Sequence, residues 1–269
     1  MTHFVTLVTS PAPVPPDVVK RLAEIVASDV YTVKLALKRP RPLILAERVE
    51  AAAAKEAASL LRGFGHEVWV FGHGEIAALA EPVRPRTLEL HRDHIRFVFP
   101  PDELVLSRWD NLFLLVRATC RMQTKQISEE HFCRAAGPEG LHIQERRTES
   151  RREGVNDLLD IYFYDGSRPV RIDADRFVFA FLGSKMGPSD SQSLETTLKV
   201  IRRMAPQAII DRGFDQFKRG AGALGRTGKA RGSMAMFVET RVDDDRPRFD
   251  FYSRLMFMIH LRRAEQPPA

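Results

Sequence analysis

The chain has 269 residues, of which 44% are hydrophobic, enough for two small domains and too few for three of typical size. Its formal charge is +6 at pH 7, and arginine supplies most of the 41 basic residues, a composition typical of a GC-rich bacterial genome. Two cysteines, Cys120 and Cys133, are too few for a disulfide framework, and we find no signal-peptide pattern and no apolar run of membrane length. We therefore expect a bacterial, cytoplasmic protein without a transmembrane segment.

Residues 1–74 predict a small α+β domain. Apolar residues recur at helical spacing after Asp17, which we expect to be the N-cap of a first helix, and Ser28-Asp29 is typical of the start of a second. An alanine-rich third helix closes at two glycines. The expected elements, in order, are strand Phe4–Ser10, the helix capped by Asp17, the helix that starts after Ser28-Asp29, strand Leu43–Leu45, helix Glu47–Leu61 and strand His66–Phe71.

This β-α-α-β-α-β order, together with the segment LRGFGHEVWV from Leu61 to Val70, resembles the C-terminal domain of the bacterial ribosomal stalk protein over residues 4–71. The resemblance implies a small sandwich of one sheet and its helices. The lysine cluster that binds factors in that family has no counterpart here, since Lys34 and Lys38 are the only lysines we associate with the first helix pair. An ACT-like or ferredoxin-like unit is the alternative topology.

Residues 75–86 predict a linker, and residues 87–206 a second, mainly antiparallel domain. The step from Trp109 to Leu112 into an apolar strand resembles bacterial members of the pleckstrin-homology-like superfold, which implies a β barrel closed by a helix. Ile127–Asn156 would be a long inserted loop. The expected strands are Thr87–His91, Ile95–Phe99, Glu103–Leu106, Leu112–Thr119, Leu158–Tyr164, Val170–Ile172 and Arg176–Phe181, with a hairpin turn at Asp165-Gly166 and a closing helix at Ser191–Met204.

Residues 207–269 predict a basic, glycine-rich loop followed by an apolar segment. The loop could contact a phosphate backbone or an acidic protein through bidentate arginines, or it could be a solvated surface loop. Its candidate binding residues are Arg212, Lys218, Arg219, Arg226, Lys229 and Arg231.

The run Phe249–Leu261 is dense in aromatic and aliphatic residues, so it must be buried. It packs either into the chain's own core, which is the more common case for such stripes, or into an interface with a partner. The candidate interface residues are Phe249, Phe251, Tyr252, Leu255 and Phe257.

No motif in the chain specifies a catalytic chemistry, a metal or a cofactor. The run from Gly220 to Gly225 matches GxGxxG but lacks the preceding strand and following helix of a dinucleotide site. The four residues Cys120, His131, Cys133 and His142 lack zinc-site spacing.

Arg147 and Arg151, followed by Asp165–Ser167, resemble the arginine pair and Asp-x-Ser signature of PilZ domains, which would imply cyclic di-GMP binding. That signature continues to a glycine, and Val170 occupies its place here. A generic hairpin turn also accounts for Asp165–Ser167.

We therefore expect a non-enzymatic binding protein, an adaptor or assembly factor, that contacts a protein partner or a second copy of itself. Nucleic-acid binding through Arg212–Arg231 is the alternative. A cyclic di-GMP sensor and an enzyme of unknown chemistry are lesser alternatives.

Overall fold

The computed structural model describes residues 3–10, 13–39, 42–101, 103–135, 141–218, 226–232 and 236–265. Contacts divide the chain into two units, the first made of Met1–Thr119, Asp157–Gly222 and Phe249–Ala269, and the second of Cys120–Asn156 and Ala223–Arg248. The fold mixes helices and strands, which confirms the expected α+β composition, and its strands form several separate sheets. None of the sheets in the described ranges closes into a barrel, so the expected barrel is not confirmed.

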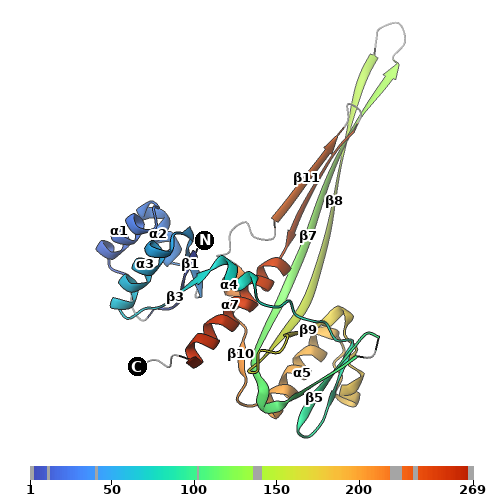
Figure 1. Ribbon diagram of the computed structural model, residues 1–269. Coiled ribbons are helices and arrows are strands. Elements are labelled where there is room, and N and C mark those ends of the chain that lie inside the picture. Colours follow the sequence, from blue (N-terminus) through green and yellow to red (C-terminus); the bar gives the residue numbers. More distant parts are fainter. Residues whose placement is uncertain are drawn as a thin grey trace. The chain divides into compact units, whose positions relative to one another are not determined.

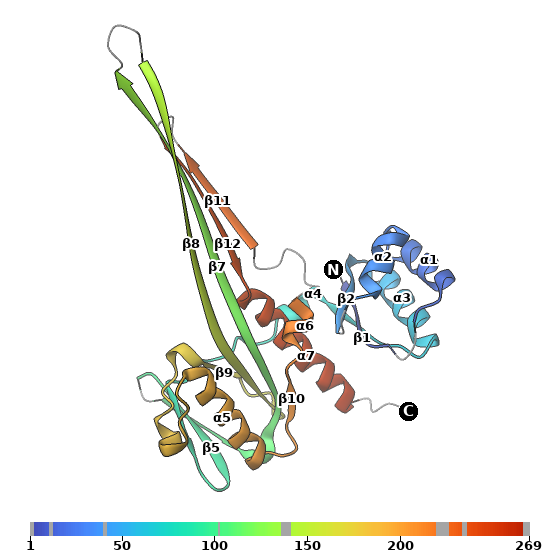
Figure 2. The same ribbon diagram turned by 180° about the vertical axis from the view of Figure 1, so that it is seen from behind.

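The N-terminal part of the first unit has the expected element order. It contains β1 (His3–Thr9), α1 (Pro16–Ile25), α2 (Val30–Leu37), β2 (Leu43–Val49), α3 (Ala51–Gly63) and β3 (Glu67–Gly72). The sheet has the order β2-β1-β3, and both pairings are antiparallel. Helices α1, α2 and α3 lie on one side of this sheet (Figures 1 and 2). Alternate residues of β1, Val5 and Leu7, share one buried cluster with Leu22 of α1 and Leu61 of α3.

Two boundaries in this part differ from expectation. The N-cap of α1 is Pro15, and Asp17 lies inside the first turn, where its charge complements the helix dipole without capping a backbone amide. Strand β2 continues to Val49, which pairs with His3, so α3 begins four residues later than the sequence pattern predicted. Asp29 does cap α2, because its Oδ1 accepts a hydrogen bond from the Thr32 amide at 2.8 Å.

The opposite face of this sheet is covered by the C-terminal helix, α7 (Arg246–Glu265). Phe4 lies 5.5 Å from Phe251 between ring centroids. The Arg262 guanidinium sits 4.5 Å from the centroid of Phe71 and donates a hydrogen bond to the Val70 carbonyl at 2.8 Å. The sheet is therefore buried on both faces within the first unit.

We expect acid to weaken this contact through Glu67. Arg263 donates two hydrogen bonds of 2.6 Å to the Glu67 carboxylate. Burial alone would raise the pKa of Glu67, but the hydrogen bonds from Arg263 and Trp69 and the charge of Arg263 bring that pKa below its usual 4.5. The carboxylate therefore stabilises the fold above about pH 4.5, and this contribution is lost as the pH falls through the lowered pKa.

Unfolding by urea at pH 7 and at low pH measures this effect. The Glu67→Gln variant should be less stable than the parent at pH 7, and the difference should narrow at low pH. A difference that does not change with pH would contradict the assignment to Glu67.

The rest of the first unit contains a second small sheet, β4-β5-β6, and the ends of two long strands. One buried cluster joins Phe97 of the small sheet to Leu112, Ile161 and Leu198. The elements are α4 (His73–Ala77), β4 (Thr87–Leu90), β5 (His94–Phe99), β6 (Glu103–Arg108), β7 (Leu112–Ala135), β8 (Leu141–Phe163), β9 (Val170–Asp173), α5 (Asp190–Met204), β10 (Ile209–Asp211) and α6 (Phe214–Lys218).

The expected strand Arg176–Phe181 does not form. Its place is taken by two 3-10 segments, Ala174–Arg176 and Ala180–Lys185, with Phe177 and Phe179 buried between them. The alternating apolar pattern of this segment reflects the burial of Phe177 and Phe179. The segment is not a strand, because its backbone makes only isolated hydrogen bonds to other segments, such as the one from the Val178 amide to the Arg86 carbonyl. The expected linker also carries structure, since Val83 forms a bridge with Val170.

The prediction of a loop at Ile127–Asn156 is wrong. In the second unit β7 continues through this range to Ala135, and β8 begins within it at Leu141. The unit consists of parts of β7 and β8 with β11 (Arg226–Gly232) and β12 (Met236–Asp244), in the order β11-β12-β7-β8. Many of its side chains are exposed and charged, so the alternation of apolar and polar residues that marks a half-buried strand is missing. Cross-strand charges support the pairing instead, as between Lys125 and Glu149 at 3.1 Å.

Candidate functional site: a lysine-rimmed groove between α1 and α2

The basic segment does not form one patch within either unit. Arg212 is described and pairs with Glu195 at 2.7 Å, while Lys218 ends α6 in the first unit. Backbone pairing places Arg226, Lys229 and Arg231 on β11 in the second unit. Arg219 lies outside the described residues, as do the side chains of the other four from Lys218 to Arg231.

The apolar run forms part of α7 and lies largely inside the protein. Phe249, Tyr252 and Leu255 have no exposed surface. Phe257 stacks on Tyr162 at 4.6 Å between centroids, and Phe251 contacts Phe4 and Phe217. In the first unit Phe249, Tyr252 and Leu255 are therefore core, while Phe251 and Phe257 are half-buried and packed against other rings.

The structure does not bring together the residues of the PilZ-like signature, and it offers no metal site among the described residues. Arg147 and Arg151 belong to the second unit, where they contact Glu129 and Glu149, whereas Asp165 belongs to the first. Asp165 accepts hydrogen bonds from Ser167 within a turn that Gly166 completes at φ 72°. No group of three metal-ligating side chains occurs among the described residues.

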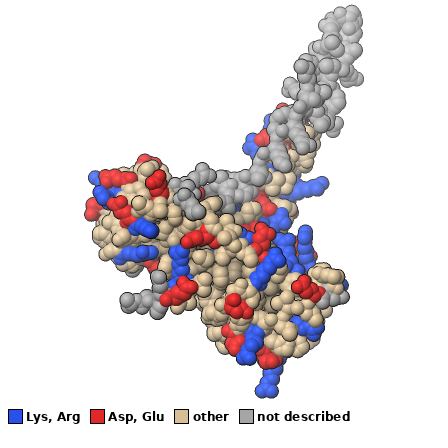
Figure 3. Space-filling model, in the orientation of Figure 1, with Lys and Arg blue, Asp and Glu red and all other residues tan. Residues whose placement is uncertain are grey.

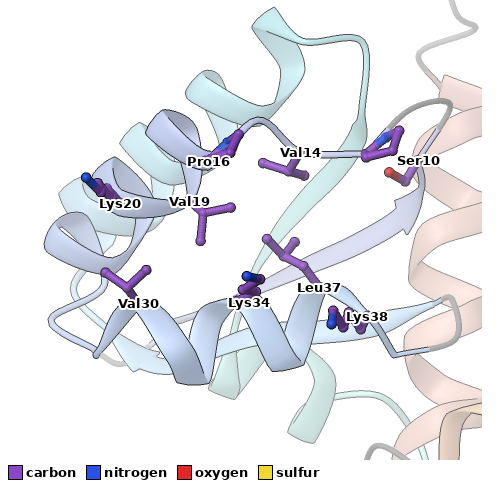
Figure 4. A pocket seen from close by; sticks show the side chains of 10 residues that line it. Ser10, Val14, Pro16, Val19, Lys20, Val30, Lys34, Leu37 and Lys38 are labelled. Carbon is purple, nitrogen blue, oxygen red and sulfur yellow. The ribbon is translucent and has the colours of Figure 1, made fainter.

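A groove of about 370 Å³ opens between α1 and α2, and its size falls within the range of ligand pockets. Residues at helical spacing on each helix face it, as Figure 4 shows for Val19 of α1 and Leu37 of α2. The lining consists of Ser10, Pro13, Val14, Pro16, Val19, Lys20, Val30, Lys34, Leu37 and Lys38.

The floor of this groove is apolar because the helices carry two adjacent apolar stripes. Val18 and Leu22 of α1 are buried against the sheet side, and Val33 of α2 joins the same cluster. Val19 and Leu37 lie beside that stripe and turn toward the space between the helices (Figure 4). The groove is therefore a continuation of the domain's core toward solvent.

Three lysines surround this apolar floor. Lys20 rises from α1, and Lys34 and Lys38 follow each other by one turn of α2; all three are exposed. None of them forms an ion pair with the part of the chain that the structure describes. Like charges at i and i+4 repel by about 0.2–0.5 kcal/mol, and a bound anion would remove this repulsion. The dipole of α2 favours cations at the same place, because Lys34 is in its last turn and Lys38 is its C-cap. No acidic residue is among the ten that line the groove.

The exposed side of α2 extends the apolar surface beyond the groove. Val30, Tyr31 and Leu35 are 43%, 69% and 43% exposed. At 100° per residue, Tyr31 and Leu35 lie next to Lys34 and Lys38 on the helix surface. The surface presented by α2 is thus a mixture of large apolar side chains and lysines, in a helix of only eight residues.

A second hollow, of about 170 Å³, offers less for binding. Its charged residues are already paired: Arg117 with Asp157 at 2.9 Å and Arg212 with Glu195 at 2.7 Å. Of these two hollows, the lysine-rimmed groove is the one whose charged side chains form no ion pair within the described residues.

No family model, curated protein or solved structure matches the chain. Within the described residues, no helix has the length and apolar content that spanning a membrane requires.

The sequence pattern predicted no site here. Lys34 and Lys38 were considered only as too few to match the lysine cluster of the stalk-protein domain, and Lys20 was overlooked. Lys20 lies fourteen residues before Lys34 and approaches both lysines because α1 and α2 pack together. The signal that could have found it was the spacing of Pro16, Val19 and Lys20 at i, i+3 and i+4.

Proposed function

We propose that this protein is a non-enzymatic binding protein whose α1–α2 groove takes an acidic, amphipathic helical segment of a partner protein. The observation that carries the proposal is the set of three exposed lysines, without ion-pair partners in the described chain, around an apolar floor. Apolar side chains of the partner would enter the groove and its carboxylates would meet the lysines.

A helix fits the site better than a compact small molecule. Lys34 and Lys38 are four residues apart, or about 6 Å along the axis of α2, which matches the spacing of acids at i and i+4 on a partner helix. The apolar surface also continues onto Tyr31 and Leu35 outside the groove, and only an extended ligand covers both areas.

The same residues fit a nucleic acid less well. Arginine, the residue that stacks on bases and grips phosphate bidentately, is absent from the groove lining, and so are aromatic side chains. Blue and red side chains alternate over the face seen in Figure 3 without a broad area of one sign among the described residues.

The likenesses to the stalk-protein domain and to a pleckstrin-homology-like domain, and a cytoplasmic location, stay proposals alongside this one. The element order of the N-terminal part supports the first likeness. The binding proposal depends on none of them.

The test uses a fluorescein-labelled peptide of about 14 residues, with leucines at i, i+3, i+4 and i+7 and glutamates beside them. Fluorescence anisotropy with the full chain should show saturable binding that weakens with salt, because the contacts are exposed. The double variant Lys34→Glu/Lys38→Glu should bind at least about tenfold more weakly, or about 1.4 kcal/mol, since two attractions become repulsions.

The matched control is Lys55→Glu/Lys199→Glu, which makes the same change in net charge at exposed lysines outside the groove. It should bind the peptide like the parent. A scrambled peptide of identical composition should bind weakly. Equal losses in both double variants would show a general charge effect and would contradict the groove.

A further inference from the structure

The two edges of the β4-β5-β6 sheet differ in how they are covered. At the β4 edge, the Val178 amide donates to the Arg86 carbonyl at 2.8 Å and the Thr87 hydroxyl donates to the Val178 carbonyl at 2.9 Å. At the other edge, β6 pairs with β5 alone in the part of the chain that the structure describes. One row of β6 backbone groups therefore has no strand partner.

This edge is apolar as well as unpaired. Leu104, Val105 and Leu106 are consecutive and are 45%, 36% and 63% exposed. Natural edge strands are usually protected by charges, prolines or bulges at such positions, because an unprotected edge pairs with another chain. Here the charges, Glu103 and Arg108, stand only at the ends of the strand.

The register with β5 assigns these side chains to faces. Val105 is opposite Phe97, which is fully buried, so Val105 lies on the core side of the sheet. Leu104 is opposite Val98 and Leu106 is opposite Arg96, on the outer side. Both faces of the sheet thus end in exposed apolar side chains at this edge.

We propose that β6 pairs antiparallel with β6 of a second copy of this chain, so that two three-stranded sheets join into one of six strands about a two-fold axis. In such a pair, residues directly opposite each other lie on the same face of the sheet. Adjacent residues of a strand lie on opposite faces, so the two-fold axis must pass through a residue and not between two residues. The choice of that residue decides which side chains meet.

An axis at Val105 matches every apolar residue with an apolar one. Val105 then faces the second copy's Val105, and Leu104 faces the second copy's Leu106. An axis at Leu104 would set Glu103 against Val105, and an axis at Leu106 would set Leu104 against Arg108. This self-complementarity is what an interface between identical copies requires, and it is why we choose a second copy over an unrelated strand.

The sharpest test of the pairing is a cysteine scan of β6. In the proposed register the two Cα atoms of position 105 are within about 4.5–5.5 Å, inside disulfide range, while those of position 104 are about 8 Å apart. The Val105→Cys chain should form a reducible covalent dimer under mild oxidation. The Leu104→Cys chain, which keeps the same native cysteines, should not.

A second measurement needs no cross-link. By light scattering after gel filtration, the parent should have twice the 30.6 kDa mass of the chain. Leu106→Lys, at a side chain that is 63% exposed and so not needed for folding, should weaken the dimer at least about tenfold. Val178→Lys, 44% exposed at the covered edge, should leave it intact.

A monomeric parent would overturn the proposal, and so would cross-linking of the Leu104→Cys chain as efficient as that of the Val105→Cys chain. Loss of the dimer in Leu106→Lys but not in Val178→Lys, together with cross-linking of the Val105→Cys chain alone, would support it. The outcome is independent of the groove, because no β6 residue lines it.

Discussion

Replacing Arg171 with leucine should lower the free energy of unfolding by about 3–5 kcal/mol, one of the two largest effects we expect from one substitution. The Arg171 guanidinium makes two hydrogen bonds, of 2.6 and 2.8 Å, to the two oxygens of Asp160. Asp160 has no exposed surface, so the variant would leave a buried carboxylate without its countercharge.

The pair is the centre of a larger network that joins β8, β9 and α7. Ser253 of α7 donates to Asp160 at 2.6 Å and shares a hydrogen bond with Tyr162, and Asp250 also accepts from Arg171. Burial alone would lower the pKa of Arg171, but the charges of Asp160 and Asp250 raise it overall, so the guanidinium stays charged.

Urea unfolding of matched variants measures this contribution. Arg203→Leu is the control, because Arg203 is exposed on α5, and its loss should change stability by less than about 0.5 kcal/mol. The double variant Asp160→Leu/Arg171→Leu should be more stable than Arg171→Leu alone, since no buried charge is left unpaired. If Arg171→Leu were no less stable than Arg203→Leu, the network would not hold the first unit together.

Replacing Phe249 with alanine should cost about 3–5 kcal/mol, the second large effect. The ring has no exposed surface, lies 5.0 Å beneath the Arg171 guanidinium and meets Phe214 edge to face at 5.4 Å. Alanine would leave a cavity at the start of the α7 segment that belongs to the first unit.

The control for this variant is Phe64→Ala, the same truncation at a ring that is 45% exposed. Thermal unfolding should show a large drop in Tm for Phe249→Ala and little change for Phe64→Ala. Equal drops in the two variants would mean that α7 is not held by this ring.

The elements best predicted from sequence are those in which the spacing of apolar residues and the capping residues indicate the same helix or strand. In the N-terminal part, apolar spacing and the cap at Asp29 gave the right order of strands and helices. The end of β2 was missed because pairing of Val49 with His3 overrides the helix propensity of the residues around Glu47.

The long strands were missed for a different reason. Many described side chains of residues 121–129 and 147–156 are charged and exposed, so these strand segments produce no apolar alternation. Pairing with β12, for example of Thr124 with Val242, depends on residues more than a hundred positions away, which a local pattern does not report.

The candidate groove was not predicted from the sequence. The lysines of α2 can be read from the sequence, but the groove exists only because α1 packs beside α2 and leaves Val19 and Leu37 facing each other across it. All six basic residues of Arg212–Arg231 were grouped by their proximity in the chain, although the two units divide them.

The most direct test of the central claim, that the α1–α2 groove binds an acidic amphipathic helix, is hydrogen–deuterium exchange of the full chain with and without the leucine–glutamate peptide. Binding in the groove predicts slower exchange in proteolytic fragments of the protein that cover residues 16–38 when the leucine–glutamate peptide is added. The scrambled peptide should cause no change in their exchange. Protection confined to other segments, or no protection at saturating peptide, would contradict the claim.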